Sequence, residues 1–326
     1  MNYYEIFKDG LKIIIKTDVT DIDIKMYKFF NGCFIINNYN NENISKELVV
    51  IDIVDRKSID YREDDYFIMN PNTRILSNEK NNIKFIYDDF DESQCLNLKR
   101  IIIDVFAKYY ESLGVYFVHG ASVVNKETNK STVFIGNSNS GKTTNLLFYL
   151  LSEKYNYMGN DRIGLRYYDG RIITYGFPSN LGLRYSTLEL NSELKNILLP
   201  YIDENSYLKI IDNGLYFKKM KLNIFDLLSI FDCEFVSKAE LEKIIVTSYD
   251  KTIHTDVFNE LSYVEVLEQL KSQHISSISK EQYFLNNILE FSDDQNEFDL
   301  CNTKVLAYKS NLHPSHNMKM KKTNKS

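Results

Sequence analysis

The chain of 326 residues contains no tryptophan, only four cysteines and four prolines, and no excess of basic residues. Its 45 acidic residues outnumber its 39 lysines and arginines, which gives a formal net charge of −6. A general nucleic-acid-binding protein would normally present a basic face, so this composition argues against that class. No apolar run reaches the roughly 18 residues that a membrane-spanning helix requires. We therefore expect neither nucleic acid nor a membrane among its partners.

The four cysteines, Cys33, Cys95, Cys233 and Cys301, lie far apart and form no C-x-x-C pair. This spacing is typical of reduced thiols in a core and disfavours a cysteine-based metal site. The first residues also lack the basic stretch followed by an apolar segment that marks a secretory signal. Together these absences predict a cytoplasmic protein.

Hydrophobic residues make up 44% of the chain, and its aromatic residues are all tyrosine or phenylalanine. A chain of this length and apolar content is expected to form two domains, or one large domain with additions. Residues 1–93 are predicted to form a β-rich accessory or substrate-recognition section, with loops at 37–41 and 88–91. Its expected strands lie at 11–15, 32–36, 48–53 and 83–87.

The following residues, 94–310, are predicted to form an α/β domain. A helix is expected at 96–113, where apolar residues recur every three or four positions. Further strands are expected at 115–118, 121–124, 132–135, 155–158 and 243–248, a hairpin at 163–168 and 171–175, and a helix at 263–270. Residues 311–326 are rich in lysine and are expected to be a flexible basic tail.

Residues 136–143, Gly-Asn-Ser-Asn-Ser-Gly-Lys-Thr, match the pattern G-x-x-x-x-G-K-[ST] at every fixed position. A β-type stretch precedes this loop and a helix-like run follows it, as a phosphate-binding loop requires. The glycines allow the backbone to curl so that its N–H groups face phosphates, and the helix N-terminus adds a favourable dipole. Lys142 would neutralise the outer phosphates and Thr143 would bind Mg²⁺. The loop predicts that the protein binds a nucleoside triphosphate.

A nucleotide site also needs a carboxylate near the metal ion, and Asp161 follows the next expected strand. We expect it to bind the metal or to act in catalysis. Arg162 beside it either neutralises phosphate charge or pairs with an acid on the surface. His119 closes the strand ahead of the loop, where it is either a structural histidine or part of the active site.

Three segments together resemble the catalytic domain of the HPr kinase/phosphorylase family, which has a phosphoenolpyruvate-carboxykinase-type nucleotide fold. They are residues 119–124 (His-Gly-Ala-Ser-Val-Val), residues 133–144 around the loop, and residues 159–161 (Gly-Asn-Asp). The similarity is greatest to shorter HPr-kinase-related proteins with a β-rich front section, and it covers about residues 96–185. The resemblance implies an α/β, phosphoenolpyruvate-carboxykinase-like P-loop core that binds ATP and Mg²⁺.

The resemblance also implies roles for individual residues. Asp161, His119 and Lys142 would be catalytic, and Thr143 and Asp161 would hold the metal ion. The lysines at 218, 219 and 221 correspond loosely to a basic position of the family, and surface charge is the expected role of at least two of them. The implied nucleotide-binding residues are Gly136, Asn137, Ser138, Asn139, Ser140, Gly141, Lys142, Thr143, Thr144 and, as a phosphate or substrate contact, Arg184.

One departure from the family is Asn160, which stands where the family usually carries the first of two aspartates. An amide cannot act as a general base, so Asp161 would have to serve both tasks, or phosphotransfer would be impaired. The leading hypothesis is an ATP-dependent kinase for a hydroxyl acceptor, either a serine of a protein or peptide or a small hydroxylated metabolite. The alternative is a nucleotide-binding regulatory protein. A homo-oligomer is also compatible with the resemblance.

Overall fold

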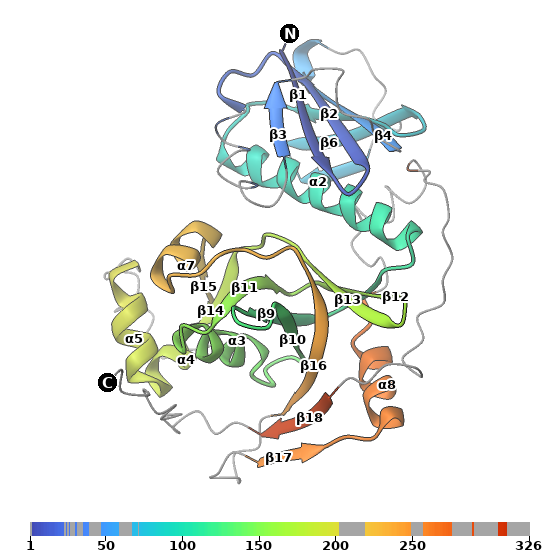
Figure 1. Ribbon diagram of the computed structural model, residues 1–326. Helices are drawn as coiled ribbons and strands as arrows, with labels where there is room; N and C mark the ends of the chain where they lie inside the picture. The colour runs from blue at the N-terminus through green and yellow to red at the C-terminus, as the bar shows by residue number, and fades with distance from the viewer. Residues whose placement is uncertain are drawn as a thin grey trace. The chain divides into compact units, whose positions relative to one another are not determined.

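The computed structural model describes residues 2–22, 24, 26, 30, 35–38, 47–58, 67–70, 72–201, 219–248, 257–275, 289 and 306–311. The chain divides into two compact units, the first of which reaches to Val115, while the second begins at Tyr116 (Figure 1). Each unit combines its own sheet with helical segments, so the protein is a mixed α/β structure. None of the helices in these ranges is long and apolar enough to cross a membrane.

The first unit contains a seven-stranded sheet in the order β3-β1-β2-β4-β7-β6-β5. Parallel pairing joins β2 to β4 and β4 to β7, and the other neighbours are antiparallel. Apolar residues dominate its central strands, which explains why this unit has a core of its own. The strands are β1 (Asn2–Lys8), β2 (Leu11–Thr17), β3 (Ile35–Asn38), β4 (Glu47–Asp55), β5 (Phe67–Asn70), β6 (Thr73–Glu79) and β7 (Asn82–Tyr87), and the 3₁₀ turn η1 (Arg56–Ser58) follows β4.

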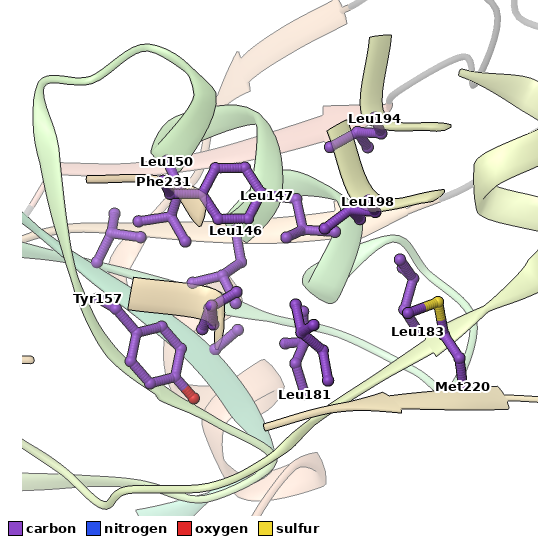
Figure 2. Close-up of a cluster of buried hydrophobic side chains, with 14 of the residues drawn as sticks. Leu146, Leu147, Leu150, Tyr157, Leu181, Leu183, Leu194, Leu198, Met220 and Phe231 are labelled. Atoms are coloured by element: carbon purple, nitrogen blue, oxygen red, sulfur yellow. The ribbon is translucent and has the colours of Figure 1, made fainter. Parts of the chain in front are cut away.

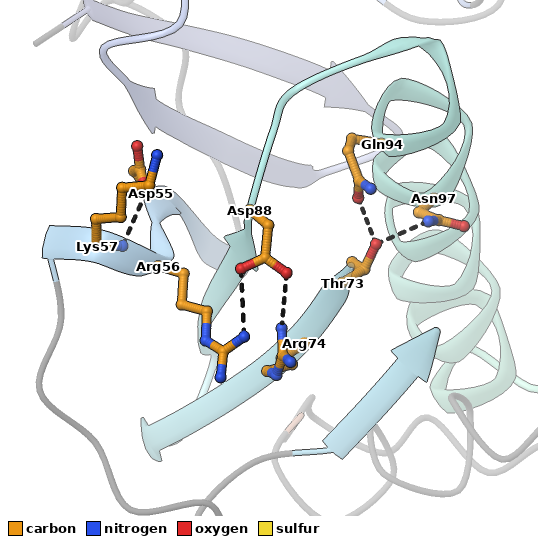
Figure 3. Close-up of polar contacts among 8 residues, drawn as sticks. All are labelled: Asp55, Arg56, Lys57, Thr73, Arg74, Asp88, Gln94 and Asn97. Carbon is orange, nitrogen blue, oxygen red and sulfur yellow. Dashed lines mark hydrogen bonds and ion pairs between the residues drawn. The ribbon is translucent and has the colours of Figure 1, made fainter. Parts of the chain in front are cut away.

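Helix α2 (Glu92–Ser112) belongs to this first unit. Asp91 caps its N-terminus by accepting from the Gln94 N–H at 3.0 Å. Thr73 of β6 hydrogen-bonds the Gln94 side chain and accepts from Asn97 Nδ2 at 2.9 Å (Figure 3). At the other end of the helix, Tyr109 donates to the Asp9 carbonyl at 2.9 Å. These contacts hold the helix against the first sheet. The boundary between the two units therefore comes after α2, whereas we expected it after residue 93 from the sequence.

The polar surface of the same unit carries an arginine–aspartate–arginine group. Asp88 lies between Arg56 and Arg74, with N–O distances of 3.4 and 3.3 Å (Figure 3). Arg74 is the more buried of the two arginines, so its contact with Asp88 is the less screened by solvent. The group joins the end of β4, the start of β6 and the end of β7.

The second unit is built on a nine-stranded sheet, with β11-β9-β10-β16-β13-β12-β8 as its main path and β17 and β18 attached through β16. Pairing is parallel between β10 and β16 and between β16 and β18. The strands are β8 (Tyr116–Val118), β9 (Gly120–Asn125), β10 (Lys130–Ile135), β11 (Tyr155–Asn160), β12 (Ile163–Tyr168), β13 (Arg171–Gly176), β16 (Lys238–Ser248), β17 (Val257–Glu260) and β18 (Leu306–Asn311).

A two-stranded ribbon and five helices complete the described part of this unit (Figure 1). The ribbon pairs β14 (Leu181–Arg184) with β15 (Lys219–Leu222) in antiparallel register. Its apolar face packs with α3 in one hydrophobic core (Figure 2). The helices are α3 (Lys142–Leu151), α4 (Tyr185–Leu190), α5 (Ser192–Leu198), α7 (Ile224–Ile230) and α8 (Tyr263–Ser272), and the short turn η3 (Leu199–Tyr201) follows α5.

Two cores cover opposite sides of the strand that leads into the loop. Phe134 of β10 belongs to the core shared with α3, whereas Val133 and Ile135 belong to a second core that contains Val266 and Leu270 of α8. Alternation along the strand explains this division, because successive side chains point to opposite faces. β10 is therefore held on both faces, which fixes the point from which the loop departs.

The segment formed by β8 and β9 runs antiparallel to the segment formed by β11 and β12. β9 pairs with β11 and β8 pairs with β12, and the pairing is interrupted between these two sets. Ile163 pairs with Val118, and Asn160 pairs with Ala121, in a common register. No residue is gained or lost between the two sets of pairs, so the ladder bends there without slipping. Residues 119–120 and 161–162 lie at this bend.

Most expected elements of the second unit are confirmed, and the hairpin at 163–176 has positive φ angles at both turn residues, Asp169 and Gly170. Two boundaries were wrong. Asn37 and Asn38, expected in a loop, lie in β3, where they pair with β1. Asn311, expected in the tail, is the last residue of β18. Residues 32–34, part of an expected strand, and 312–326, the rest of the expected tail, lie outside the described residues.

Candidate phosphate-binding site

The loop at residues 136–143 joins β10 to α3, as its sequence predicts. Gly136 has a φ of +145°, and a Cβ atom there would collide with the Thr247 carbonyl of β16 and lie 2.7 Å from Ser140 Oγ. Gly141 precedes α3 with a φ of +96°, a left-handed conformation that glycine adopts without strain. The two fixed glycines are thus explained by close packing at one end of the loop and by backbone conformation at the other.

Lys142 is held against the loop itself. Its Nζ donates to the Gly136 carbonyl at 2.6 Å and to the Asn137 carbonyl at 3.0 Å, and the residue is 8% exposed. Burial lowers the pKa of Lys142, while Asp161 raises that pKa and Lys219 lowers it further. Both of these side chains therefore lie within electrostatic range of the loop lysine.

Asn160 and Asp161 stand where the family that this sequence resembles usually carries two aspartates, and Thr143 contacts Asn160, not Asp161. Thr143 Oγ1 donates to Asn160 Oδ1 at 3.3 Å. Asn160 is the last residue of β11 and is 4% exposed, and its backbone carbonyl accepts from Ser179 Oγ at 3.0 Å. A neutral amide thus occupies the position beside the loop hydroxyl.

Asp161 lies instead beside His119. His119 Nε2 is 3.9 Å from Asp161 Oδ1, and the side chains are 42% and 65% exposed. Both residues lie at the bend of the β8–β9 and β11–β12 ladder, where Asp161 has a φ of +70°. The bend brings a carboxylate and an imidazole together at the surface, and such a pair can accept and pass on a proton.

The other predicted residues are spread around this centre. Ser140 Oγ and Thr247 Oγ1 share a hydrogen bond of 2.6 Å, while the loop tip at 137–139 and Thr144 make solvent-accessible surface. Arg162 is half-buried at the bend. Arg184 lies on the ribbon, directly opposite Lys219. Lys218 lies outside the described residues.

Two residues that the sequence did not indicate support the loop. Thr247 of β16 donates to the Ile135 carbonyl at 3.0 Å and contacts Ser140, as described above. Gln273, at the end of α8, donates from Nε2 to Asn137 Oδ1 at 3.2 Å, and its carbonyl accepts from the His119 N–H at 2.8 Å. Gln273 thus joins the loop to the segment that carries His119.

Two side-chain oxygen atoms meet beside the loop, that of Thr143 at the start of α3 and that of Asn160 at the end of β11. Such a pair suits Mg²⁺ better than a metal that needs several charged or imidazole ligands. Within the described ranges no three His, Cys, Asp or Glu side chains gather into a metal site. Magnesium usually binds one or two protein oxygens and completes its shell with phosphate and water. The Thr143 hydroxyl and the Asn160 amide oxygen fit that requirement.

Comparison with known proteins finds no matching family model and no matching curated protein. Among solved structures, the chain is similar to the HPr(Ser) kinase/phosphatase from Coxiella burnetii. That similarity covers 62% of this chain and 82% of the other, with 13% sequence identity and a TM-score of 0.29. A likeness at this level leaves the function to be argued from the residues of the site.

Proposed function

We propose that this protein is an ATP-dependent kinase that transfers the γ-phosphoryl group of ATP to a hydroxyl acceptor. The observation that carries the proposal is the pairing of the phosphate-binding loop with a separate His119–Asp161 pair at the nearby bend. A binding loop alone would suffice for a nucleotide-binding module. Phosphoryl transfer to a hydroxyl also requires a group that accepts the hydroxyl proton. The His119–Asp161 pair supplies such a group, and its carboxylate lies within electrostatic range of Lys142.

The loop would hold the nucleotide. Backbone N–H groups at the start of α3 face an anion favourably because the helix dipole is positive there. Lys142 would exchange its bonds to the loop carbonyls for contacts with the outer phosphates, which suits a lysine whose charge is otherwise disfavoured by burial. Thr143 and Asn160 would hold Mg²⁺, which stabilises the charge that develops on the phosphates during transfer.

Asp161 would accept the proton of the acceptor hydroxyl, and His119 would orient the carboxylate. As the acceptor oxygen forms its bond to the γ-phosphorus, the bond from that phosphorus to the bridging oxygen breaks, and ADP leaves. In this proposal Asp161 is the base. The metal contact, which we expected from Asp161 on the basis of the sequence, is made by Asn160 instead. Family resemblance at residues 119–124, 133–144 and 159–161 supports the same reaction class.

A nucleotide-binding regulatory protein is the second candidate, and the Thr143–Asn160 contact favours it. The asparagine brings no negative charge to the metal position, so metal-assisted transfer would be weaker than with an aspartate. The two candidates differ in product formation.

Incubation of the protein with MgATP and panels of hydroxylated metabolites and serine peptides, followed by ³¹P NMR, distinguishes them. A kinase yields ADP and a new phosphate ester. Tight nucleotide binding with neither product would contradict the kinase proposal and support the regulatory one.

A further inference from the structure

The ribbon of β14 and β15 presents three cations on one face. Arg184 pairs directly with Lys219, and Gly182 pairs directly with Lys221. Directly opposed residues of an antiparallel pair project to the same side, so Arg184, Lys219 and Lys221 share a face. We call this the basic face of the ribbon.

The other face of the ribbon is fully committed to the core. Its side chains belong to the same cluster as the leucines of α3, the helix that begins with Lys142 (Figure 2). The basic face is therefore the outer one, and the ribbon cannot turn over without exposing that core. The core residues on the ribbon are Leu181, Leu183, Met220 and Leu222.

Several observations indicate that the basic face is arranged for an anion. Like charges directly opposite each other disfavour a β pair, and Arg184 and Lys219 are opposed in this way. The Lys219 side chain extends across Gly182, since a Cβ at Gly182 would lie 3.5 Å from Lys219 Cδ and 3.9 Å from its Nζ. This path brings the Lys219 ammonium to the part of the face that Lys221 shares. In the described part of the chain, none of the three cations pairs with a carboxylate.

The basic face also lies close to the proposed chemistry. The ribbon packs in one core with α3, the helix that begins with Lys142, and the charges of Lys219 and Asp161 both act on Lys142. An anion on the ribbon would thus lie near the loop that holds the nucleotide and near the proposed base. An anion bound on the ribbon would be repelled by the transferred phosphate, and nearby cations are needed to offset that repulsion.

We infer that the basic face of the ribbon, chiefly Arg184 and Lys219, is a binding site for an anionic group of the acceptor, a phosphate or a carboxylate. This inference rests on the proposed kinase function and narrows its acceptor to a hydroxyl compound or peptide that carries a negative charge near the hydroxyl. A phosphate or carboxylate accepts charge-assisted hydrogen bonds from both side chains, and the planar arginine can bind it in bidentate fashion.

The test uses inorganic phosphate as the probe and the complex with Mg²⁺ and a non-hydrolysable ATP analogue as the receptor. The analogue fills the loop, including the γ-phosphate position, so phosphate that binds must occupy another site. Calorimetric titration of the wild-type complex is expected to show saturable binding. Arg184→Ala and Lys219→Ala should each weaken it by about tenfold or more. Lys154→Ala, which removes an exposed lysine far along the chain from the ribbon, is the control of equal charge and should bind like the wild type.

Absence of saturable phosphate binding, or equal binding by all variants, would overturn the inference. The same variants titrated with ADP and with the ATP analogue identify the source of the anion. If Lys219→Ala weakened binding of the analogue by tenfold but not that of ADP, the basic face would contact the γ-phosphate of the nucleotide, and the acceptor site would be refuted. If the wild type bound phosphate but no nucleotide, the kinase proposal would fail while the anion site stood.

Discussion

The two polar pairs of the candidate site differ in burial and in charge. The Thr143–Asn160 pair is a neutral hydrogen bond at the foot of α3, and its asparagine is 4% exposed. The His119–Asp161 pair is made of titratable groups, of which the carboxylate is 65% exposed. Consecutive residues of one strand end, 160 and 161, thus contribute to two different environments.

This difference suggests a division of labour. A neutral pair whose asparagine is buried can fix the position of a hydroxyl and a metal ion but cannot take up a proton. An exposed carboxylate beside an imidazole can take up a proton and is accessible to an acceptor. The inner pair is therefore expected to govern nucleotide and metal binding, and the outer pair to govern turnover. Substitutions in each pair should break this division in different ways.

The largest effect is expected from Lys142→Ala. This change removes the only loop side chain that carries a positive charge, so nucleotide affinity and turnover should both fall, turnover by about 1000-fold. Lys142→Arg keeps the charge but not the fit to the loop carbonyls and should lose less affinity. Calorimetry and phosphoryl-transfer rates measure the two quantities. Wild-type turnover in Lys142→Ala would contradict the placement of the nucleotide in this loop.

Asp161→Asn should come next, and it should separate the two pairs. The change removes the proposed base while preserving shape, so turnover should fall about 100-fold. Nucleotide affinity should stay close to that of the wild type, because Thr143 contacts Asn160. A matched loss of affinity for MgATP would show that Asp161 serves the metal ion after all.

A smaller effect of opposite sign is expected from Asn160→Asp. A carboxylate beside the Thr143 hydroxyl gives Mg²⁺ a charged ligand, so the magnesium concentration needed for half-maximal nucleotide binding should fall about tenfold. Asn160→Leu, which offers no oxygen atom, is the comparison and should raise it. Equal magnesium dependence in both variants would place the metal ion elsewhere.

The smallest effect is expected from Gln273→Leu. The substitution leaves Asn137 without its donor from α8 while it preserves much of the side-chain volume, so nucleotide affinity should fall about fivefold. Lys271→Ala, on the exposed side of the same helix end, should bind nucleotide normally. Unchanged affinity in Gln273→Leu would mean that the loop needs no support from α8.

The parts of the site that the sequence predicts are those made by consecutive residues. The strand, loop and helix around residues 136–143 follow from local conformation and were found in order. The start of α2 at Glu92 could have been read from Asp91, whose side chain caps Gln94, because aspartate is a favoured N-cap residue.

The choice between Asn160 and Asp161 could not be read from the sequence. Strand alternation decides which of two neighbours faces the loop, and β11 has a register shift between Tyr157 and Gly159 that changes the alternation. The contact between Gln273 and Asn137 joins residues 136 positions apart and has no motif. The boundary after α2 depends equally on distant contacts, those of the helix with Thr73 and Asp9.

The division between nucleotide binding at the loop and proton transfer at the outer pair is tested most directly by one paired measurement on wild type, Lys142→Ala and Asp161→Asn. Transfer of label from γ-labelled ATP to an acceptor would be measured beside MgATP affinity for the same preparations. The account expects both variants to lose transfer, while only Lys142→Ala loses affinity. Label transfer by Asp161→Asn at the wild-type rate, or wild-type binding without transfer to any hydroxyl acceptor, would contradict it.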